Sequence, residues 1–540
     1  MPANKPPRAR GPWRVLVSDP IADTGIELLR SAGPALAVEV KTGSAPDQLK
    51  RDVASADALI VRSETKVTAD VIAAAPRLKV VGRAGVGVDN IDLAAATRRG
   101  ILVLTAPEGN TIAAAEHAMA MLLAMARNIP AAQDSLKGGE WKRSRFTGRE
   151  LYGKVLGVVG LGRIGREVAK RARAFGMTVV GTDPLVGEDR ARELGIELAT
   201  LKALVRKADF ISLHAALTPE TRHLLGAPEF AAMKRGVRIV NCARGGLLDE
   251  RALAAAITSG RVAGAALDVF EAEPPPKDHP LFKLDGVVVT PHLGASTEEA
   301  QTNVSRVVAE QVRDYLLHGT VRNAVNAPAA PAELLGEIGP YLDLAERMGR
   351  FLIQLTDGAP KRLELDYHGE IAKRDPAPFT ASAVRGVLSH ALGDRVNVIN
   401  AATLARDRGI AVQERRSSEP AEFSSLIRLT IVTAGGNRTA EGSVMGKGEP
   451  HLVSVDGLHL DIVPAGAMIT FTNVDRPGIV GRVGTILGRH RVNIAGLHLG
   501  RVSIGKRAVS IFSVDPPVPP AVLKELAALS ELSDVRLVEV

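Results

Sequence analysis

The sequence is poor in the features that mark secreted and membrane proteins. Cys242 is the one cysteine among 540 residues, which excludes a disulfide framework and favours a reducing compartment. The most apolar run, residues 118–126, is far shorter than the ~20 residues that a membrane span needs. Residues 1–12 are basic and proline-rich with no apolar stretch behind them, which is typical of a disordered tail rather than a signal peptide. We therefore expect a cytoplasmic protein without a membrane partner.

Aromatic side chains are also scarce, at 3% of the residues, and basic residues form no blocks. The net charge of +8 is small for this length because basic and acidic residues alternate along the chain. Nucleic-acid binding needs clustered cations and stacking aromatic rings, so we expect no nucleic-acid partner. The chain is too long for a single hydrophobic core, and we expect several domains.

What the sequence does contain is a regular alternation of short apolar strands and helical stretches. It predicts strands over 15–17, 58–61, 78–81, 154–159, 178–182, 210–213, 238–241, 265–267 and 287–289, and long helices over 110–126 and 297–317. This order is typical of doubly wound parallel sheets. Residues 326–331 contain two prolines and predict a linker. A weakly marked α/β region then leads to residues 467–540, where strand, helix, strand, strand, helix, strand predicts a split-βαβ sandwich.

The segment Gly160-Leu161-Gly162-Arg163-Ile164-Gly165 is a G-x-G-x-x-G motif that follows an apolar strand and opens a helix predicted over 166–175. Its glycines suit a tight turn, close approach of a pyrophosphate and close helix packing, and a helix N-terminus attracts phosphate. Asp183 ends the next strand, where an acid binds the ribose hydroxyls and repels a 2′-phosphate. The motif predicts an NAD site; the alternative is an ordinary turn with a surface aspartate.

Three polar residues, Arg244, Glu273 and His292, each follow a predicted strand, at the edge where open α/β sheets carry their sites. Each alone is compatible with a structural role. Together they supply what oxidation of a 2-hydroxy acid requires. His292 can accept the hydroxyl proton, Glu273 can orient it and stabilise its protonated form, and Arg244 can bind the substrate carboxylate.

The motifs around these residues resemble those of the D-isomer-specific 2-hydroxyacid dehydrogenases over residues 13–328. The match includes Gly-Leu-Gly-Arg-Ile-Gly, Asn-Cys-Ala-Arg-Gly-Gly, Leu-Asp-Val-Phe-Glu-Ala-Glu-Pro and Thr-Pro-His-Leu-Gly-Ala-Ser-Thr. The resemblance implies NAD as cofactor and Arg244, Glu273 and His292 as catalytic residues, and we expect no metal ion. It also implies that the cofactor is lined by Val86, Gly160, Gly162, Arg163, Ile164, Gly165, Asp183, Ala215, Cys242, Ala243, Arg244, Asp268, His292, Gly294 and Ala295.

Within this family the chain resembles the members that act on 3-phospho-D-glycerate, through residues 61–66 and 82–90. The resemblance implies substrate contacts from Arg62, Ser63, Lys66, Gly85, Asn110 and Arg145. Arg62 and Lys66 offer cations to a phosphate, which a glycerate or lactate enzyme would not need. Arg145 could reach a phosphate across a dimer. The alternative for Lys66 and Arg145 is solvated surface charge.

Residues 331–540 resemble the C-terminal part of the longer members, an intervening domain followed by an ACT domain. The segment 472–481 has the ACT first-loop pattern, in which Pro477 suits the first helical turn. The resemblance implies an L-serine effector between paired ACT domains, with Asp475 binding the ammonium and Asn493 the carboxylate. The alternative is that Asp475 caps its helix and Asn493 shapes a turn.

The predicted fold class is α/β, with a Rossmann-type doubly wound nucleotide domain inserted in a flavodoxin-like substrate domain, then an α/β intervening domain and a ferredoxin-like ACT domain. The predicted boundaries are 1–12 for the tail, 13–108 and 296–328 for the discontinuous substrate domain, 109–295 for the NAD-binding domain, 329–465 for the intervening domain and 466–540 for the ACT domain. The family implies a homodimer or homotetramer.

The predicted activity is NAD-dependent oxidation of 3-phospho-D-glycerate to 3-phosphohydroxypyruvate, the first step of L-serine biosynthesis. One alternative is oxidation of another D-2-hydroxy acid, such as glycerate or 2-hydroxyglutarate. A second is a non-catalytic sensor of NADH and an amino acid. The presence of Arg244, Glu273 and His292 counts against the sensor, since a sensor needs no proton acceptor.

Overall fold

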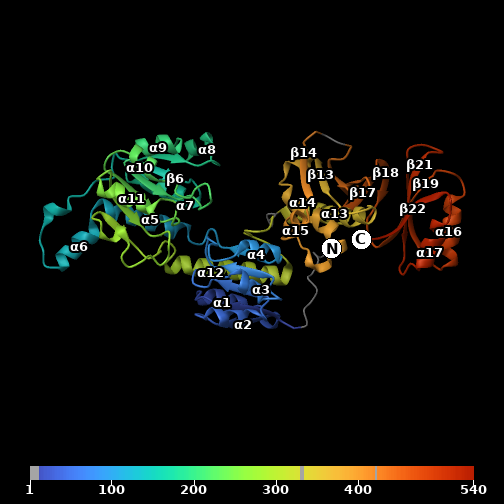
Figure 1. Ribbon diagram of the computed structural model, residues 1–540, viewed down its shortest axis with the longest axis horizontal. Helices are drawn as coiled ribbons and strands as arrows, with labels where there is room; N and C mark the ends of the chain where they lie inside the picture. The colour runs from blue at the N-terminus through green and yellow to red at the C-terminus, as the bar shows by residue number, and fades with distance from the viewer. Residues whose placement is uncertain (1–10, 329–333, 420–421) are drawn as a thin grey trace.

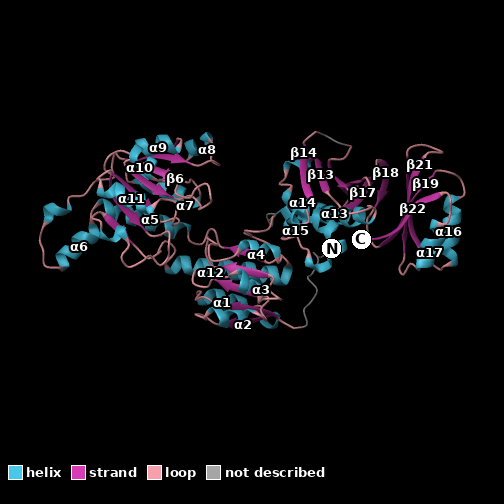
Figure 2. Cartoon of the chain, in the orientation of Figure 1, coloured by secondary structure: helices cyan, strands magenta, loops and turns pink. Residues whose placement is uncertain are grey.

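The computed structural model describes residues 11–328, 334–419 and 422–540, which form four β-sheets with their helices (Figures 1 and 2). Most of the expected tail, and residues 329–331 of the expected linker, lie outside these residues. Among the described helices, none is both long and apolar enough to cross a membrane.

The first sheet is parallel, with the strand order β2-β1-β3-β4-β5. Its strands are β1 (Trp13–Val17), β2 (Leu36–Val40), β3 (Ala58–Val61), β4 (Val80–Arg83) and β5 (Leu102–Thr105), and its helices are α1 (Asp23–Arg30), η1 (Gly33–Ala35), α2 (Pro46–Val53), α3 (Ala69–Ala73) and α4 (Leu93–Arg98). The strands β3 and β5 are buried along their whole length because helices cover both faces. The order is that of a flavodoxin-like sheet, as predicted.

The second sheet is also parallel, with the order β12-β11-β10-β9-β6-β7-β8. Its strands are β6 (Val155–Val159), β7 (Thr178–Thr182), β8 (Glu197–Leu198), β9 (Phe210–Leu213), β10 (Val237–Asn241), β11 (Val262–Leu267) and β12 (Val287–Val289). Its helices are α7 (Arg163–Ala174), α8 (Glu188–Glu193), α9 (Leu201–Lys207), α10 (Ala227–Ala232), α11 (Glu250–Thr258) and η3 (Pro280–Lys283). This arrangement confirms the predicted Rossmann-type sheet.

Two helices connect these two sheets, so the second sheet is an insertion in the first unit (Figure 1). The chain leaves the first sheet through α5 (Thr111–Ala126) and returns through α12 (Glu298–His318), which packs on α1 and β4. Gly319 ends α12 in the left-handed conformation with φ 71°. The two connections touch at Gly109, where a side-chain carbon would lie 2.5 Å from Val304 of α12.

A short arm, α6 (Ile129–Lys137) with η2 (Arg143–Phe146), follows α5 and extends away from the second sheet in Figure 1. Apolar side chains lie exposed on it: Ile129 at 52%, Leu136 at 55% and Trp141 at 77%. Exposed apolar groups of this size are typical of a surface that contacts another chain.

The third sheet is mixed, with the order β14-β13-β15-β16-β17-β18. Its elements are α13 (Leu335–Gln354), β13 (Arg362–Gly369), η5 (Glu370–Lys373), α14 (Ala377–Leu392), η6 (Gly393–Arg395), α15 (Ala401–Asp407), β14 (Ala411–Ser417), β15 (Ser425–Val432), β16 (Asn437–Met445), β17 (Glu449–Val455) and β18 (Leu458–Ile462). The helices α13 and α14 cover one face, against Leu363, Leu365 and Tyr367 of β13.

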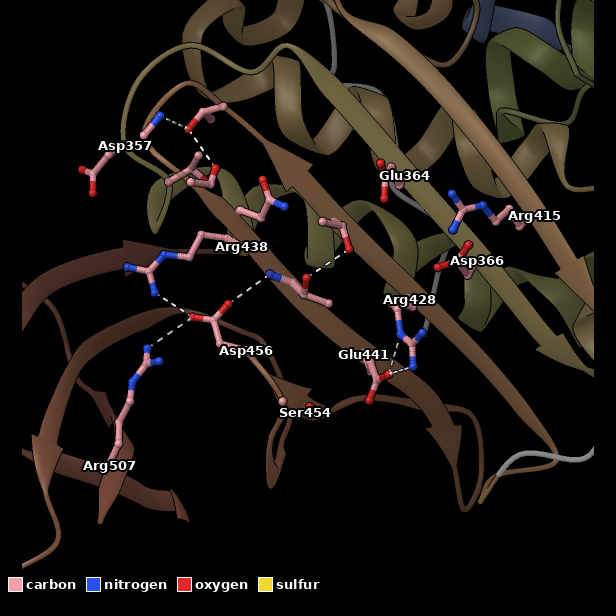
Figure 3. Close-up of a pocket in the computed structure, with 18 residues that line it drawn as sticks. Asp357, Glu364, Asp366, Arg415, Arg428, Arg438, Glu441, Ser454, Asp456 and Arg507 are labelled. Carbon is pink, nitrogen blue, oxygen red and sulfur yellow. Dashed lines mark hydrogen bonds and ion pairs between the residues drawn. The ribbon is translucent and has the colours of Figure 1, made fainter. Parts of the chain in front are cut away.

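The opposite face of the third sheet carries a row of alternating charges (Figure 3). Arg415, Asp366, Arg428 and Glu441 occupy facing positions on four adjacent strands, and Arg428 bonds Glu441 at 2.6 Å. Facing opposite charges stabilise neighbouring strands. This row borders a cavity of about 800 Å³ that Arg507 of the fourth sheet also lines.

The fourth sheet is antiparallel, with the order β20-β21-β19-β22. Its elements, β19 (Ala467–Val474), α16 (Ile479–Arg489), β20 (Ile494–Arg501), β21 (Arg507–Val514), α17 (Pro520–Ala527) and β22 (Leu532–Glu539), follow the predicted split-βαβ order. The prediction for Pro477 is wrong. The helix α16 starts at Ile479, and Gly478 precedes it with φ 93°, a conformation that glycine adopts without steric cost.

The third and fourth sheets share one hydrophobic core. Met468, Val509, Ile511 and Val538 of the fourth sheet belong to the same buried cluster as the residues of α13 and β13. Gln354 of α13 also exchanges two hydrogen bonds with the backbone of Glu539, at 2.9 and 3.1 Å. The last two sheets therefore form one packed unit.

Candidate active site

His292 and Glu273 form a pair beside the carboxyl ends of β12 and β11. His292 Nδ1 lies 2.8 Å from Glu273 Oε2, and Glu273 Oε1 accepts a hydrogen bond of 3.1 Å from the Phe270 N–H. Burial opposes ionisation of Glu273, but the bonds from His292 and Phe270 outweigh it and hold the pKa of Glu273 below its usual value. When Nδ1 donates to this carboxylate, Nε2 of the neutral ring is free to accept a proton.

The loop that carries His292 is fixed by Asp268, a fully buried residue at the end of β11. Its carboxylate accepts hydrogen bonds from the backbone N–H groups of Leu293 at 2.7 Å and Gly294 at 2.8 Å, and from the Thr290 hydroxyl at 2.6 Å. The His292 N–H donates to the Asp268 carbonyl at 2.9 Å. This loop holds His292 at φ 56°, a left-handed conformation that is uncommon outside glycine.

Arg244 lies on the turn after β10, which Asn241 and Gly245 shape. Buried Asn241 accepts from the Ala243 N–H at 3.1 Å and donates to the Arg244 carbonyl at 2.9 Å. A side-chain carbon on Gly245 would lie 1.8 Å from the Phe270 carbonyl, so the turn sits against the segment that leads to Glu273. From this turn Arg244 Nε reaches Asp89 of the first unit at 3.1 Å and bridges the two parallel sheets.

Three predicted substrate residues lie on the loop after β3: Arg62, Ser63 and Lys66. Buried Asp19 holds this loop, because its carboxylate accepts hydrogen bonds from the backbone N–H groups of Arg62 at 2.6 Å and Thr65 at 3.1 Å. Asn90 donates to the carbonyls of Arg62 and Thr65 at 2.9 and 2.7 Å. The loop backbone is therefore rigid.

Arg83, at the carboxyl end of β4, is a functional candidate that the sequence analysis did not include. Its Nε is buried without a hydrogen-bond partner among the described residues. Burial and then the charge of nearby Arg244 lower the pKa of Arg83 to about 10. A Cβ atom on Gly85 would lie 1.6 Å from the Arg83 guanidinium, which occupies that space. A Cβ atom on Gly87 would likewise lie 1.9 Å from the Arg244 guanidinium. These contacts explain the glycines that flank predicted Val86.

The signal for Arg83 was present in the sequence, since it is a cation that ends a buried strand at the catalytic edge. Asp19 and Asn90 carried no such signal, because their role depends on hydrogen bonds to a loop far along the chain.

The glycine motif has the geometry that a dinucleotide requires. Gly160 has φ 93° and lies against Ala215, and a side-chain carbon on Gly165 would lie 2.0 Å from the Gly160 carbonyl. A Cβ atom on Gly162 would have no atom within 4 Å among the described residues, which leaves open space for a pyrophosphate. The helix α7 begins at Arg163, three residues earlier than predicted, because Gly162 is its N-cap. Its first N–H groups, including those of Arg163 and Ile164, therefore surround this space.

Asp183 lies beside the motif and is fixed by two backbone groups. Its two oxygens accept from the N–H groups of Leu161 and Leu185, each at 2.8 Å. Each carboxylate oxygen retains a second lone pair for a ribose hydroxyl. A negative charge at this position disfavours a 2′-phosphate, which suits NAD rather than NADP.

The remaining predicted cofactor residues follow the carboxyl ends of three strands: Ala215 after β9, Cys242 and Ala243 after β10, and Gly294 and Ala295 in the loop after β12. Burial, with a smaller contribution from Asp268, raises the pKa of the Cys242 thiol, so this cysteine stays protonated. Burial also lowers the pKa of His214, next to Ala215, to about 4. Gly294 is within contact distance of Asp268, and Ala243 and Ala295 lie on the turns of Arg244 and His292. Within the described residues no cluster of three or more histidine, cysteine or carboxylate side chains could hold a metal ion.

Two predicted substrate residues differ in their relation to this site. Asn110 precedes α5 between the two units, and its Oδ1 is buried without a partner among the described residues. Arg145 lies on the exposed arm, where its guanidinium stacks 5.7 Å from the Phe146 ring. No contact joins Arg145 to the other predicted substrate residues of its own chain within the described residues.

The predicted effector residues already have partners within the fourth sheet. Asp475 accepts from Arg501 at 2.6 Å and caps no helix, and the Asn493 amide donates to Asp515 at 2.8 Å. An amino acid that binds these residues would have to displace these partners or share the two side chains with them.

Comparisons with known proteins agree with this geometry. The family described as "D-isomer specific 2-hydroxyacid dehydrogenase, NAD binding domain" matches residues 119–294, the "D-3-phosphoglycerate dehydrogenase intervening domain" matches 337–456, and the ACT domain matches 467–531. The D-3-phosphoglycerate dehydrogenase of Methanocaldococcus jannaschii is 45% identical over 526 residues, 97% of this chain and 99% of that protein. That of Bacillus subtilis is 40% identical over 531 residues, 98% and 99% of the two chains. The chain belongs to the D-3-phosphoglycerate dehydrogenases.

Solved structures resemble the first two units. A D-lactate dehydrogenase from Aquifex aeolicus complexed with NAD and lactic acid is 29% identical, with a TM-score of 0.52, over 58% of this chain and all of that one. An NAD-dependent formate dehydrogenase from Staphylococcus aureus in complex with NAD is also 29% identical, with a TM-score of 0.53, over 59% of this chain and all of that one. The cofactor of this family fits the open space at Gly162.

Replacing Glu273 by glutamine should shift the pH dependence of oxidation. The low pKa of Glu273 keeps a negative charge beside His292 that stabilises the protonated imidazole, and a neutral amide removes this stabilisation. We expect the acid limb of the kcat/KM profile for oxidation to move to lower pH. A profile that superimposes on that of the wild type would contradict the functional pairing of the two side chains.

Proposed function

We propose that this enzyme oxidises 3-phospho-D-glycerate to 3-phosphohydroxypyruvate, the first step of L-serine biosynthesis. The proposal is carried by two observations: the His292–Glu273 pair, and the group of arginines that Arg244 of the second unit forms with Arg62 and Arg83 of the first. Close similarity to D-3-phosphoglycerate dehydrogenases over nearly the whole chain supports it.

In the proposed mechanism His292 accepts the C2 hydroxyl proton at Nε2, and Glu273 stabilises the imidazolium that forms. NAD, when bound, supplies the acceptor for the hydride that leaves C2. Gly160, Gly162, Gly165 and the N-terminus of α7 would hold its pyrophosphate, and Asp183 its ribose. Arg244 binds the substrate carboxylate and polarises the C2 oxygen as it becomes a carbonyl.

We assign the substrate phosphate to Arg62, Lys66 and Arg83. Arg62 and Lys66 extend from a loop whose backbone Asp19 and Asn90 hold, and Arg83 Nε, beside Gly85, has no partner among the residues that the structure describes. A phosphate with a carboxylate brings about three negative charges, which suits this group of cations better than a plain hydroxy acid does. The side-chain oxygen of Asn110, which has no partner within the described part of the chain, would accept a hydrogen bond from a substrate hydroxyl.

The proposed domain division follows the four sheets: 13–108 with 296–328, 109–295, 329–465 and 466–540. We further propose a homodimer or homotetramer in the cytoplasm. The exposed apolar side chains of the arm support an association in which Arg145 reaches the phosphate in the partner subunit.

Replacing His292 by alanine should lower kcat by at least ~10²-fold, the usual contribution of a positioned acid/base, and leave NADH binding nearly intact. His223 offers a matched control, since it is also left-handed, at φ 53°, and bonds a carboxylate, Glu271, at 3.1 Å. We expect His223→Ala to keep a kcat close to that of the wild type. NADH formation from 3-phosphoglycerate measures both variants, and a near-normal kcat for His292→Ala would remove His292 from the mechanism.

Replacing Arg83 by methionine or Arg62 by alanine should weaken phosphate recognition selectively. Losing a hydrogen bond to a charged group, about 1.5–3 kcal/mol, predicts a KM for 3-phosphoglycerate raised by ~10–100-fold. The KM for an unphosphorylated 2-hydroxy acid should change much less. Steady-state kinetics with both substrates measures the difference, with exposed Arg98→Ala as control. Equal effects on both substrates would mean that these arginines bind the carboxylate or are structural.

We also propose that L-serine binds at Asp475 and Asn493 and slows turnover, with a coupling of ~1–3 kcal/mol. Binding would replace the Arg501–Asp475 and Asn493–Asp515 contacts by the ammonium and carboxylate of the ligand. Calorimetry should detect L-serine on the wild type and a weaker affinity on Asn493→Ala. Absence of binding to the wild type would contradict the proposal and leave the fourth sheet an assembly module.

A further inference from the structure

His117 makes a polar contact with the catalytic loop from the helix that connects the two parallel sheets. It lies in the second turn of α5, and its side chain is 19% exposed. Its Nε2 is 3.1 Å from Asp268 Oδ1 and 3.2 Å from Thr290 Oγ1. None of the motifs discussed above includes this histidine.

The surrounding hydrogen bonds determine where the His117 proton lies. Thr290 has one hydroxyl proton and donates it to Asp268 Oδ1 at 2.6 Å, so its oxygen can only accept from His117. Asp268 is held ionised: burial opposes this, but the bonds from His117, Thr290 and Leu293 N–H outweigh burial and lower its pKa. Both neighbours are therefore acceptors, and His117 must carry a proton on Nε2.

This donor helps to fix the loop of His292. The Asp268 carboxylate bonds the N–H groups of Leu293 and Gly294, which directly follow His292. Those bonds hold His292 in a left-handed conformation that costs energy for a side chain other than glycine. A buried carboxylate that loses one donor binds water or reorients, and both changes loosen the loop.

The position of His117 on α5 links this loop to the substrate side of the enzyme. The same helix starts after Asn110, the proposed substrate residue, and Met121 one turn later contacts Thr290 at 3.7 Å. A rigid helix therefore carries both the substrate contact and the support of the catalytic loop.

We propose that His117 is a positioning residue that, through Asp268 and Thr290, holds His292 in its catalytic conformation. The inference rests on the proposed role of His292 as acid/base. It predicts that the Nε2–H donor matters, and not the volume or the charge of the ring.

The kinetic test compares His117→Leu, which keeps volume without a donor, with His117→Gln, whose amide can donate from a similar position. We expect His117→Leu to lower kcat by ~10–100-fold, the range for losing a hydrogen bond to a buried charge, with KM values little changed. The primary isotope effect with substrate deuterated at C2 should increase, because hydride transfer becomes rate-limiting. His117→Gln should recover most of the activity. Glu116→Gln, on the adjacent exposed residue, should behave as the wild type.

A second measurement needs no activity. Hydrogen exchange of residues 290–296, followed by mass spectrometry, reports the amides of Leu293 and Gly294 that Asp268 holds. It should be faster in His117→Leu and unchanged in His117→Gln and Glu116→Gln. Inactivity of the wild type on 3-phosphoglycerate would contradict the proposed function, and this exchange pattern would still test His117.

Three results would overturn the inference. One is a His117→Leu variant with normal kcat, isotope effect and exchange. Another is a large rise in KM for NAD with unchanged kcat, which would mean that His117 serves the cofactor. The third is equal loss in the leucine and glutamine variants with equal loss of thermal stability, which would mean that His117 acts through packing.

Discussion

Uncompensated positive charge at the edges of the two parallel sheets is the constraint on which the site depends. Burial, and then the charge of nearby Arg244, lowers the pKa of Arg83 to about 10. Asp89 accepts a hydrogen bond from Arg244, whereas Asp19 accepts hydrogen bonds from the backbone of the loop after β3. The local carboxylates therefore offset only part of the positive charge. The fold holds these cations close together with too few carboxylates to balance their charge. An anionic substrate supplies the missing negative charge when it binds.

Much of the first two sheets could be predicted because buried parallel strands are short, continuous apolar runs between helices. The spans 178–182, 210–213 and 287–289 coincide with β7, β9 and β12. The strands of the third sheet and their order could not be predicted from the sequence. Its strands place charged residues on one face, as in β13, and their pairing joins segments that are distant along the chain. The prediction that Pro477 lies in the first helical turn was wrong because Gly478 forms the turn before the helix, and α16 begins only at Ile479.

The candidate site divides in the same way. Arg244, Glu273 and His292 could be predicted because each stands in a local motif at a strand end, and the His292–Glu273 bond then follows from the parallel order of β11 and β12. Asp19 and His117 could not, because what matters in each is a hydrogen bond to a remote segment. Local motifs identify the candidate reacting groups, whereas the packing of the fold identifies the residues that hold them.

The core shared by the third and fourth sheets limits how such a chain can be divided. The fourth sheet contributes Met468, Val509, Ile511 and Val538 to the same hydrophobic core as α13 and β13. Removing this sheet would therefore expose a broad apolar surface on the third sheet and its helices. The seam for gene fusion or loss lies instead between α12 and α13, where much less shared interior would be opened. Among the described residues, Ile399 is the one buried side chain of the third unit in the core of the first sheet. Natural shortening of this enzyme would therefore discard both C-terminal sheets together, and an ACT module transplanted from it would have to carry its neighbour with it.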